Sequence, residues 1–95
     1  MIHVVKHADS ELDLKFDWQR SFQEPGDAVD GDLGWRVLPS DDAGDLAITS
    51  HSCGRFQSAA VLKGGRAGQV YMVRAQVETT RARVIERTIV VRIAA

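Results

Sequence analysis

A strict alternation of apolar and charged residues near the start of the chain limits the folds that it can adopt. Leu12, Leu14, Phe16 and Trp18 are each separated from the next by one charged residue. Successive side chains of a β-strand point to opposite faces of its sheet, so this pattern predicts a strand with one buried face. On a helix, at about 100° per residue, the same apolar side chains would scatter around the axis.

Short apolar segments of this kind recur along the whole chain, with turn residues between them. We expect strands over 12–18, 33–38, 46 to 51 or 53, 56–62, 71–78 and 85–93, with a further short strand over 2–6. If that first strand is absent, residues 1–10 form a flexible or partner-docking arm. Six or seven short strands without a long helical pattern predict an all-β sandwich or a small barrel.

The segments between these strands carry residues that favour turns. We expect a loop over 19–32, which includes Pro25, Gly26 and Gly31, and one helical turn around 18–22 is an alternative within it. Turns are also expected at 39–44, 63–68 and 81–83. The last of these joins the two final strands into an antiparallel hairpin.

The composition limits the chain to one domain, which we place over 1–95. With 95 residues and a formal net charge of −1, there is no electrostatic reason to expect nucleic acid. No apolar run approaches the roughly 20 residues of a membrane span, and the first residues are too polar for a signal peptide. The single cysteine, Cys53, excludes an internal disulfide and fits a protein that folds in a reducing cytoplasm.

One residue pair and one acidic cluster carry side chains capable of chemistry, but neither has the pattern of a catalytic or metal site. His51 and Cys53 share one strand face, but a structural zinc site needs four ligands and there is no second cysteine. The pair also stands too far apart to act as a nucleophile and its base. Asp27, Asp30 and Asp32 do not follow the EF-hand spacing and leave only a weak cation site as an alternative.

The Gly-rich segment 63–68 resembles a phosphate-binding loop only superficially. It lacks the Gly-Lys-Ser/Thr ending of such a loop, and a strand follows it where a helix would be needed. We therefore interpret its glycines as residues of a tight turn. No set of acid, base and nucleophile converges, so we expect no enzyme, no cofactor and no metal site.

Arginines crowd the C-terminal half of the chain and favour a protein-facing surface. No aromatic residues alternate with them to stack on bases, whereas the planar arginine side chain suits protein interfaces. The candidate interface residues are Arg66 in the Gly-rich turn and Arg81 and Arg83 in the final turn.

Three stretches of the chain occur in an order and spacing shared with a known family. They are Leu12-Asp13-Leu14-Lys15-Phe16-Asp17-Trp18, then Gly26-Asp27-Ala28-Val29 with Trp35-Arg36-Val37, then Val61 to Val73 with Thr79-Thr80 and Glu86-Arg87. Together they span residues 11 to 93 and resemble the phage fibre–tail adaptor proteins. The final turn, 81–83, departs from the family because it lacks a glycine and is one residue shorter, and Ala59-Ala60 replaces bulkier residues.

The resemblance implies an immunoglobulin-like antiparallel β-sandwich of about seven short strands. Phe16, Trp18 and Trp35 are then core residues, and Gly64, Gly65 and Gly68 shape a turn before Tyr71. This is the place of a tyrosine corner, in which the hydroxyl bonds to backbone upstream, with simple core packing as the alternative.

The resemblance also implies a structural role in a phage particle. The chain would link tail or neck components to fibres through protein–protein contacts, without catalytic residues. Its expected partners are other virion proteins, in multiple symmetric copies and without nucleic acid or membrane, after folding in the host cytoplasm. The alternative is a free-standing binding module of the same fold that recognises a glycan or a host protein.

Overall fold

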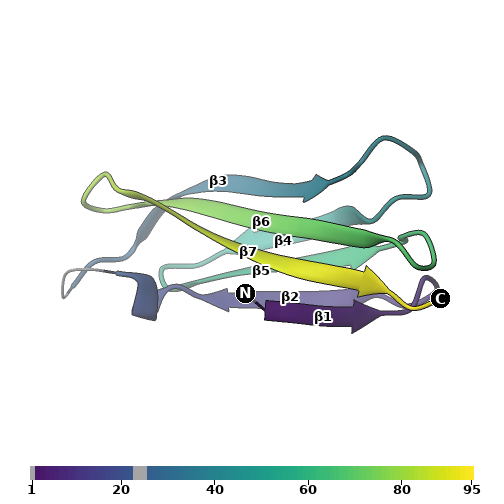
Figure 1. Cartoon of the computed structure of the whole chain (residues 1–95). Helices are drawn as coiled ribbons and strands as arrows, with labels where there is room; N and C mark the ends of the chain where they lie inside the picture. The colour runs from purple at the N-terminus through teal and green to yellow at the C-terminus, as the bar shows by residue number, and fades with distance from the viewer. Residues whose placement is uncertain (1, 23–25) are drawn as a thin grey trace.

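Seven strands and one short 3-10 helix make up the computed structural model, which describes residues 2–22 and 26–95 (Figure 1). The elements are β1 (Ile2–Lys6), β2 (Leu12–Asp17), η1 (Gln19–Ser21), β3 (Val29–Leu38), β4 (Ala47–Cys53), β5 (Gln57–Lys63), β6 (Val70–Thr79) and β7 (Val84–Ile93). The expected turn at Pro25 and the first residue of the proposed arm lie outside the described residues. No helix in the described ranges is both long and apolar enough to cross a membrane.

The strands form two sheets that face each other, which confirms the predicted all-β sandwich. One sheet has the order β1-β7-β6-β3 and the other has the order β2-β5-β4. Four of the pairings are antiparallel as predicted, whereas β1 pairs in parallel with β7. Residues 2–6 of the proposed arm therefore lie in the sheet. The finer immunoglobulin-like assignment stays a prediction.

The core lies between the sheets and follows the alternation of the sequence. Buried side chains include Leu14 and Phe16 of β2, Leu62 of β5, and Val73 and Val77 of β6. Together the two inner faces enclose one continuous apolar cluster. Since a domain of this size buries only about two-thirds of its unfolded surface, these contacts carry most of its stability.

The aromatic residues named from the sequence lie in or against this core. Trp18 is fully buried just after β2, and its indole Nε1–H donates to the Ser58 Oγ over 2.9 Å. Trp35 of β3 is half-buried and stacks on Phe16 across the two sheets, with the ring centroids 5.2 Å apart. Trp35 thus packs against the core from the edge strand β3 and is not enclosed by it.

β3 is the element that the sequence describes least well. It begins at Val29, inside the segment 19–32 that we expected to be a loop. Its register against β6 shifts between Asp32 and Gly34, so Leu33 is an extra residue of a β-bulge and is exposed. A regular strand over 33–38 would have placed Leu33 on the same face as Trp35, but the bulge breaks the alternation between them.

The sandwich is elongated, with extents of 43, 21 and 18 Å. Its turns consequently gather at two distant ends (Figure 1). One end holds the β3–β4 loop and the β5–β6 turn, and the other holds the β6–β7 turn and the segment before β3.

Candidate interaction surfaces

Tyr71 organises the end of the molecule that holds the Gly-rich β5–β6 turn. Its hydroxyl accepts from the Arg66 backbone N–H over 3.0 Å and donates to the Asp45 Oδ1 over 2.7 Å. The first contact is the upstream backbone bond of a tyrosine corner. The second ties the turn to the β3–β4 loop, which the sequence did not indicate.

Asp45 is the anchor of that loop. Its Oδ2 accepts from the backbone N–H groups of Asp41 and Asp42, each over 3.0 Å. The hydrogen bond from Tyr71, together with these backbone donors, holds the pKa of the Asp45 carboxyl below its ordinary value. Burial raises the pKa of the Tyr71 phenol, so Tyr71 remains a donor to this carboxylate.

The glycines of the turn allow the chain to close over the core. Gly65 has a φ of +103°, and a Cβ there would lie 2.6 Å from the Ile93 Cδ1. Beside it, the Gly64 carbonyl oxygen accepts from the buried Lys6 Nζ over 2.8 Å. The turn is thus fixed from both sides and is a rigid part of this end.

Arg66 is held by the same network. Its side chain is 54% exposed and pairs with the Asp42 carboxylate at 2.6 Å and with the Asp45 carboxylate at 3.5 Å. The Arg66 guanidinium is exposed enough to contact a partner protein, but its position is fixed by these two carboxylates of the same chain. Arg81 and Arg83 lie at the other end of β6, so the structure does not bring the three candidate interface arginines together (Figure 1).

The opposite end is organised by Asp27 and the β6–β7 turn. The Asp27 Oδ1 accepts from the Thr80 Oγ1–H over 2.6 Å and from the Ala28 N–H over 2.9 Å. The hydrogen bond from Thr80 is the main reason why the pKa of the Asp27 carboxyl is lowered. The Thr79 Oγ1 accepts from the backbone N–H groups of Arg81 and Arg83, which shapes the turn.

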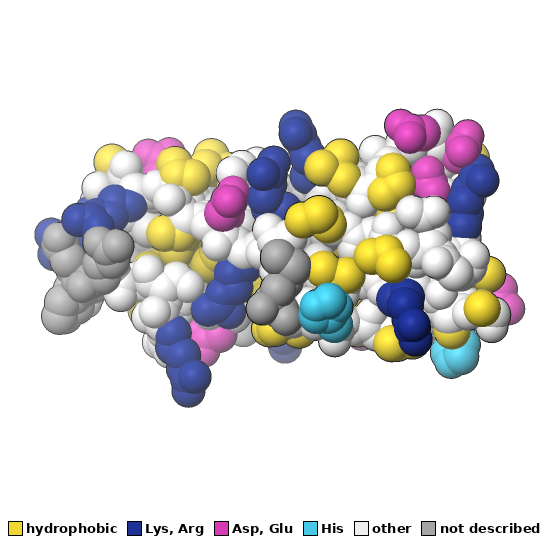
Figure 2. Space-filling model, in the orientation of Figure 1, with side chains coloured by type: hydrophobic (Ala, Val, Ile, Leu, Met, Phe, Trp, Pro, Cys, Tyr) yellow, Lys and Arg dark blue, Asp and Glu magenta, His cyan; other side chains and the backbone are white. Residues whose placement is uncertain are grey.

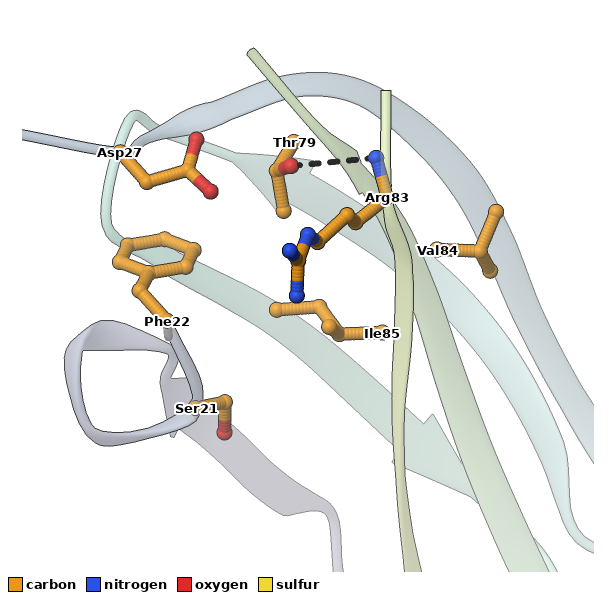
Figure 3. A pocket seen from close by; sticks show the side chains of 7 residues that line it. All are labelled: Ser21, Phe22, Asp27, Thr79, Arg83, Val84 and Ile85. Atoms are coloured by element: carbon orange, nitrogen blue, oxygen red, sulfur yellow. Dashed lines mark hydrogen bonds between the residues drawn. The ribbon is translucent and has the colours of Figure 1, made fainter. Parts of the chain in front are cut away.

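A cavity of about 380 Å³ opens between these elements (Figure 3). Figure 3 shows the Arg83 side chain reaching into it, with the Phe22 ring and the Asp27 carboxylate opposite and Ile85 below. Arg83 thus stands in a partly apolar recess at the tip of the molecule.

A third surface, which sequence reasoning did not predict, is the outer face of the β1-β7-β6-β3 sheet. Among the described residues, the exposed large apolar side chains on this face are Val5, Leu38, Val70, Met72 and Val84. The described strands of the other sheet carry none on their outer face. Figure 2 shows hydrophobic side chains gathered over one half of this face, with basic side chains around them.

The histidine and the cysteine of β4 make contacts within the chain. His51 Nδ1 lies 3.2 Å from the Asp32 Oδ2, and this pair links the free edges of β4 and β3. The Cys53 Sγ lies 3.4 Å from the Ser58 Oγ. Within residues 2–22 and 26–95, no three His, Cys, Asp or Glu side chains gather as a metal site would require.

The sequence that builds these elements matches a protein family along nearly its whole length. The family model described as podophage GP4 fiber-tail adaptor protein gp77 matches residues 6–92. The chain belongs to this family. A comparison with curated proteins found no match. Membership makes the chain a phage tail adaptor protein and thereby a component of the virion.

Proposed function

We propose that this chain is a purely structural adaptor that links tail or neck components to fibres through protein–protein contacts. The observation that carries the proposal is the family match over residues 6–92. The chain folds in the host cytoplasm before it joins the particle, and it performs no catalytic step. Its partners are other virion proteins, with no role for nucleic acid or membrane.

The shape of the sandwich supports a bridging role. The two clusters of turns lie at opposite ends of a molecule 43 Å long, and β6 and β7 run between them as ten-residue strands. Each cluster is fixed by its own buried carboxylate, Asp45 at one end and Asp27 at the other. Two rigid ends on one stiff body can each hold a different partner, because ordering them at binding costs little entropy.

The alternative of a glycan-binding module draws no support from the tryptophans. A sugar site needs exposed aromatic faces, whereas Trp18 is fully buried and Trp35 stacks on Phe16. The adaptor role therefore stays the single proposed function.

The proposal is tested with the tail and fibre proteins of the same phage. The purified chain is incubated with each protein separately and with both together, and complexes are resolved by size-exclusion chromatography. We expect a ternary complex. Arg81→Glu at the hairpin end and Asp41→Arg in the β3–β4 loop should each weaken binding to one partner and leave the other unchanged. A folded chain that binds neither protein would overturn the adaptor role.

A further inference from the structure

The outer face of the β1-β7-β6-β3 sheet differs in character from the outer face of the other sheet. Val70 and Met72 point outward from β6 and are each 46% exposed, and Leu38 beside Met72 on β3 is 52% exposed. Val90, opposite Met72 on β7, is partly exposed. The outer face of the other sheet, by contrast, carries the charged side chains of Asp13, Lys15, Asp17 and Lys63. Among the described strands, large exposed apolar side chains on an outer face therefore lie on the β1-β7-β6-β3 sheet, and Figure 2 shows them gathered there.

We propose that this face binds the same face of a second copy of the chain, around a two-fold axis that runs along the strands between β6 and β7. This proposal does not depend on the adaptor role. It rests on the register of the two strands and on the polarity of the pairs that the axis would create.

The β6–β7 register determines which side chains such an axis brings together. A two-fold parallel to the strands places each β6 residue over its own register partner on β7 of the other copy. The outward pairs are Val70 with Arg92, Met72 with Val90, Arg74 with Thr88, Gln76 with Glu86, and Glu78 with Val84. Met72 and Val90 then form an apolar centre, and no like charges oppose each other in these pairs.

A two-fold axis across the strands fits less well. Placed at the middle of the face, it sets Arg74 over Arg74 of the second copy, so that two like charges oppose each other. Placed at Met72, it leaves half of the face uncovered. The face consists of four strands of up to ten residues and could bury roughly 600 Å² on each copy. Such an area is at the low end for a specific protein interface, so a dimer needs the whole face. The axis along the strands is the one that uses all of it.

The test is sedimentation of the purified chain over a range of concentrations, with variants on both sheets. We expect the wild type to dimerise reversibly and Met72→Lys and Val90→Asp each to weaken dimerisation about tenfold or more. Ser52→Lys, an exposed site on the other sheet, is the matched control and should leave it unchanged. Unchanged melting temperatures establish that the variants are folded.

Mixing the Met72→Lys and Val90→Asp variants tests the axis itself. In a mixed dimer, the lysine introduced into one chain would lie over the aspartate introduced into the other, while the second Met72–Val90 contact would place two unaltered apolar side chains together. The mixture should therefore dimerise more tightly than either variant alone. A wild type that stays monomeric at millimolar concentration overturns self-association and leaves the face to another virion protein. A mixture no tighter than the single variants overturns the axis.

The outcome is separable from that of the adaptor proposal. A monomeric Met72→Lys chain that still joins tail and fibre proteins leaves the adaptor role intact. Loss of tail and fibre binding by a wild type that dimerises would overturn only the adaptor role.

Discussion

At the scale of single residues, Tyr71 shows how one hydroxyl can join two loops. It is fully buried, and its oxygen serves both the Arg66 backbone N–H and the Asp45 carboxylate. Tyr71→Phe keeps the ring and removes both bonds, so the Arg66 N–H and the carboxylate each lose a partner. We expect a loss of about 1–3 kcal/mol in the free energy of unfolding, measured by urea denaturation. An unchanged midpoint with an unchanged slope would contradict the importance of this hydroxyl.

Two glycines of the same turn separate backbone strain from crowding. Gly65 and Gly68 both have positive φ, at +103° and +79°, so alanine strains the backbone at either site. Only at Gly65 would the new Cβ meet another side chain, that of Ile93, whereas at Gly68 it meets nothing within 4 Å.

We therefore expect Gly65→Ala to destabilise the chain by about 1–3 kcal/mol more than Gly68→Ala, because the core is already close-packed. The comparison of their thermal melts sets the steric cost at Gly65 against a site that has positive φ but no crowding. Equal melting temperatures would mean that Ile93 moves aside freely.

At the scale of elements, the β6–β7 turn contains a residue that is unsuited to its backbone. Ala82 has a φ of +60°, and its N–H donates to the Thr79 carbonyl oxygen over 2.9 Å. This is the turn in which the resemblance to the adaptor family predicts a glycine that the sequence lacks. Ala82→Gly should raise the free energy of unfolding by about 0.5–1 kcal/mol, because relief of strain exceeds the entropy that glycine adds to the unfolded chain.

The measurement is a urea melt of Ala82→Gly beside a second variant at an ordinary backbone angle. Ala59→Gly in β5 serves for comparison and should be destabilising, since glycine weakens a strand interior. Destabilisation of both variants would show that the turn is not strained at Ala82.

The elements that could be predicted from sequence are those whose alternation is unbroken. β2 and β6 lie where their apolar residues indicated, because every second side chain enters the core. The first half of β3 could not be predicted, since Asp30, Gly31 and Asp32 favour a loop and become a strand only by pairing with β6. The parallel pairing of β1 is likewise a tertiary feature, which no local pattern encodes.

At the scale of the whole molecule, the candidate surfaces depend on strand order. Sequence alternation indicates that Val70 and Met72 face away from the core, but it cannot indicate that Leu38 and Val5 join them on one face. That follows from the order β1-β7-β6-β3. Strand direction similarly explains why Arg66 is remote from Arg81 and Arg83, although all three are candidate interface residues in the sequence.

The two ends of the molecule share one chemical device, a buried carboxylate that accepts from a neighbouring hydroxyl. Asp27 accepts from Thr80 and Asp45 accepts from Tyr71, and both carboxyls have a lowered pKa. A carboxyl whose pKa is lower when folded stabilises the fold above its unfolded pKa, and this stabilisation is lost as pH falls through the folded pKa. Stability should therefore decline below the ordinary carboxyl value of 3.8.

This acid dependence should divide into two independent parts. The carboxylates lie at opposite ends of β6, a strand of ten residues that spans roughly 30 Å, so their effects should add. Asp27→Asn and Asp45→Asn should each flatten the decline in unfolding free energy between neutral and acid pH, and the double variant should flatten it by the sum. Urea melts along the pH series measure the slopes, with exposed Asp13→Asn as the control. A double variant no flatter than the single ones would mean that one end alone governs acid unfolding.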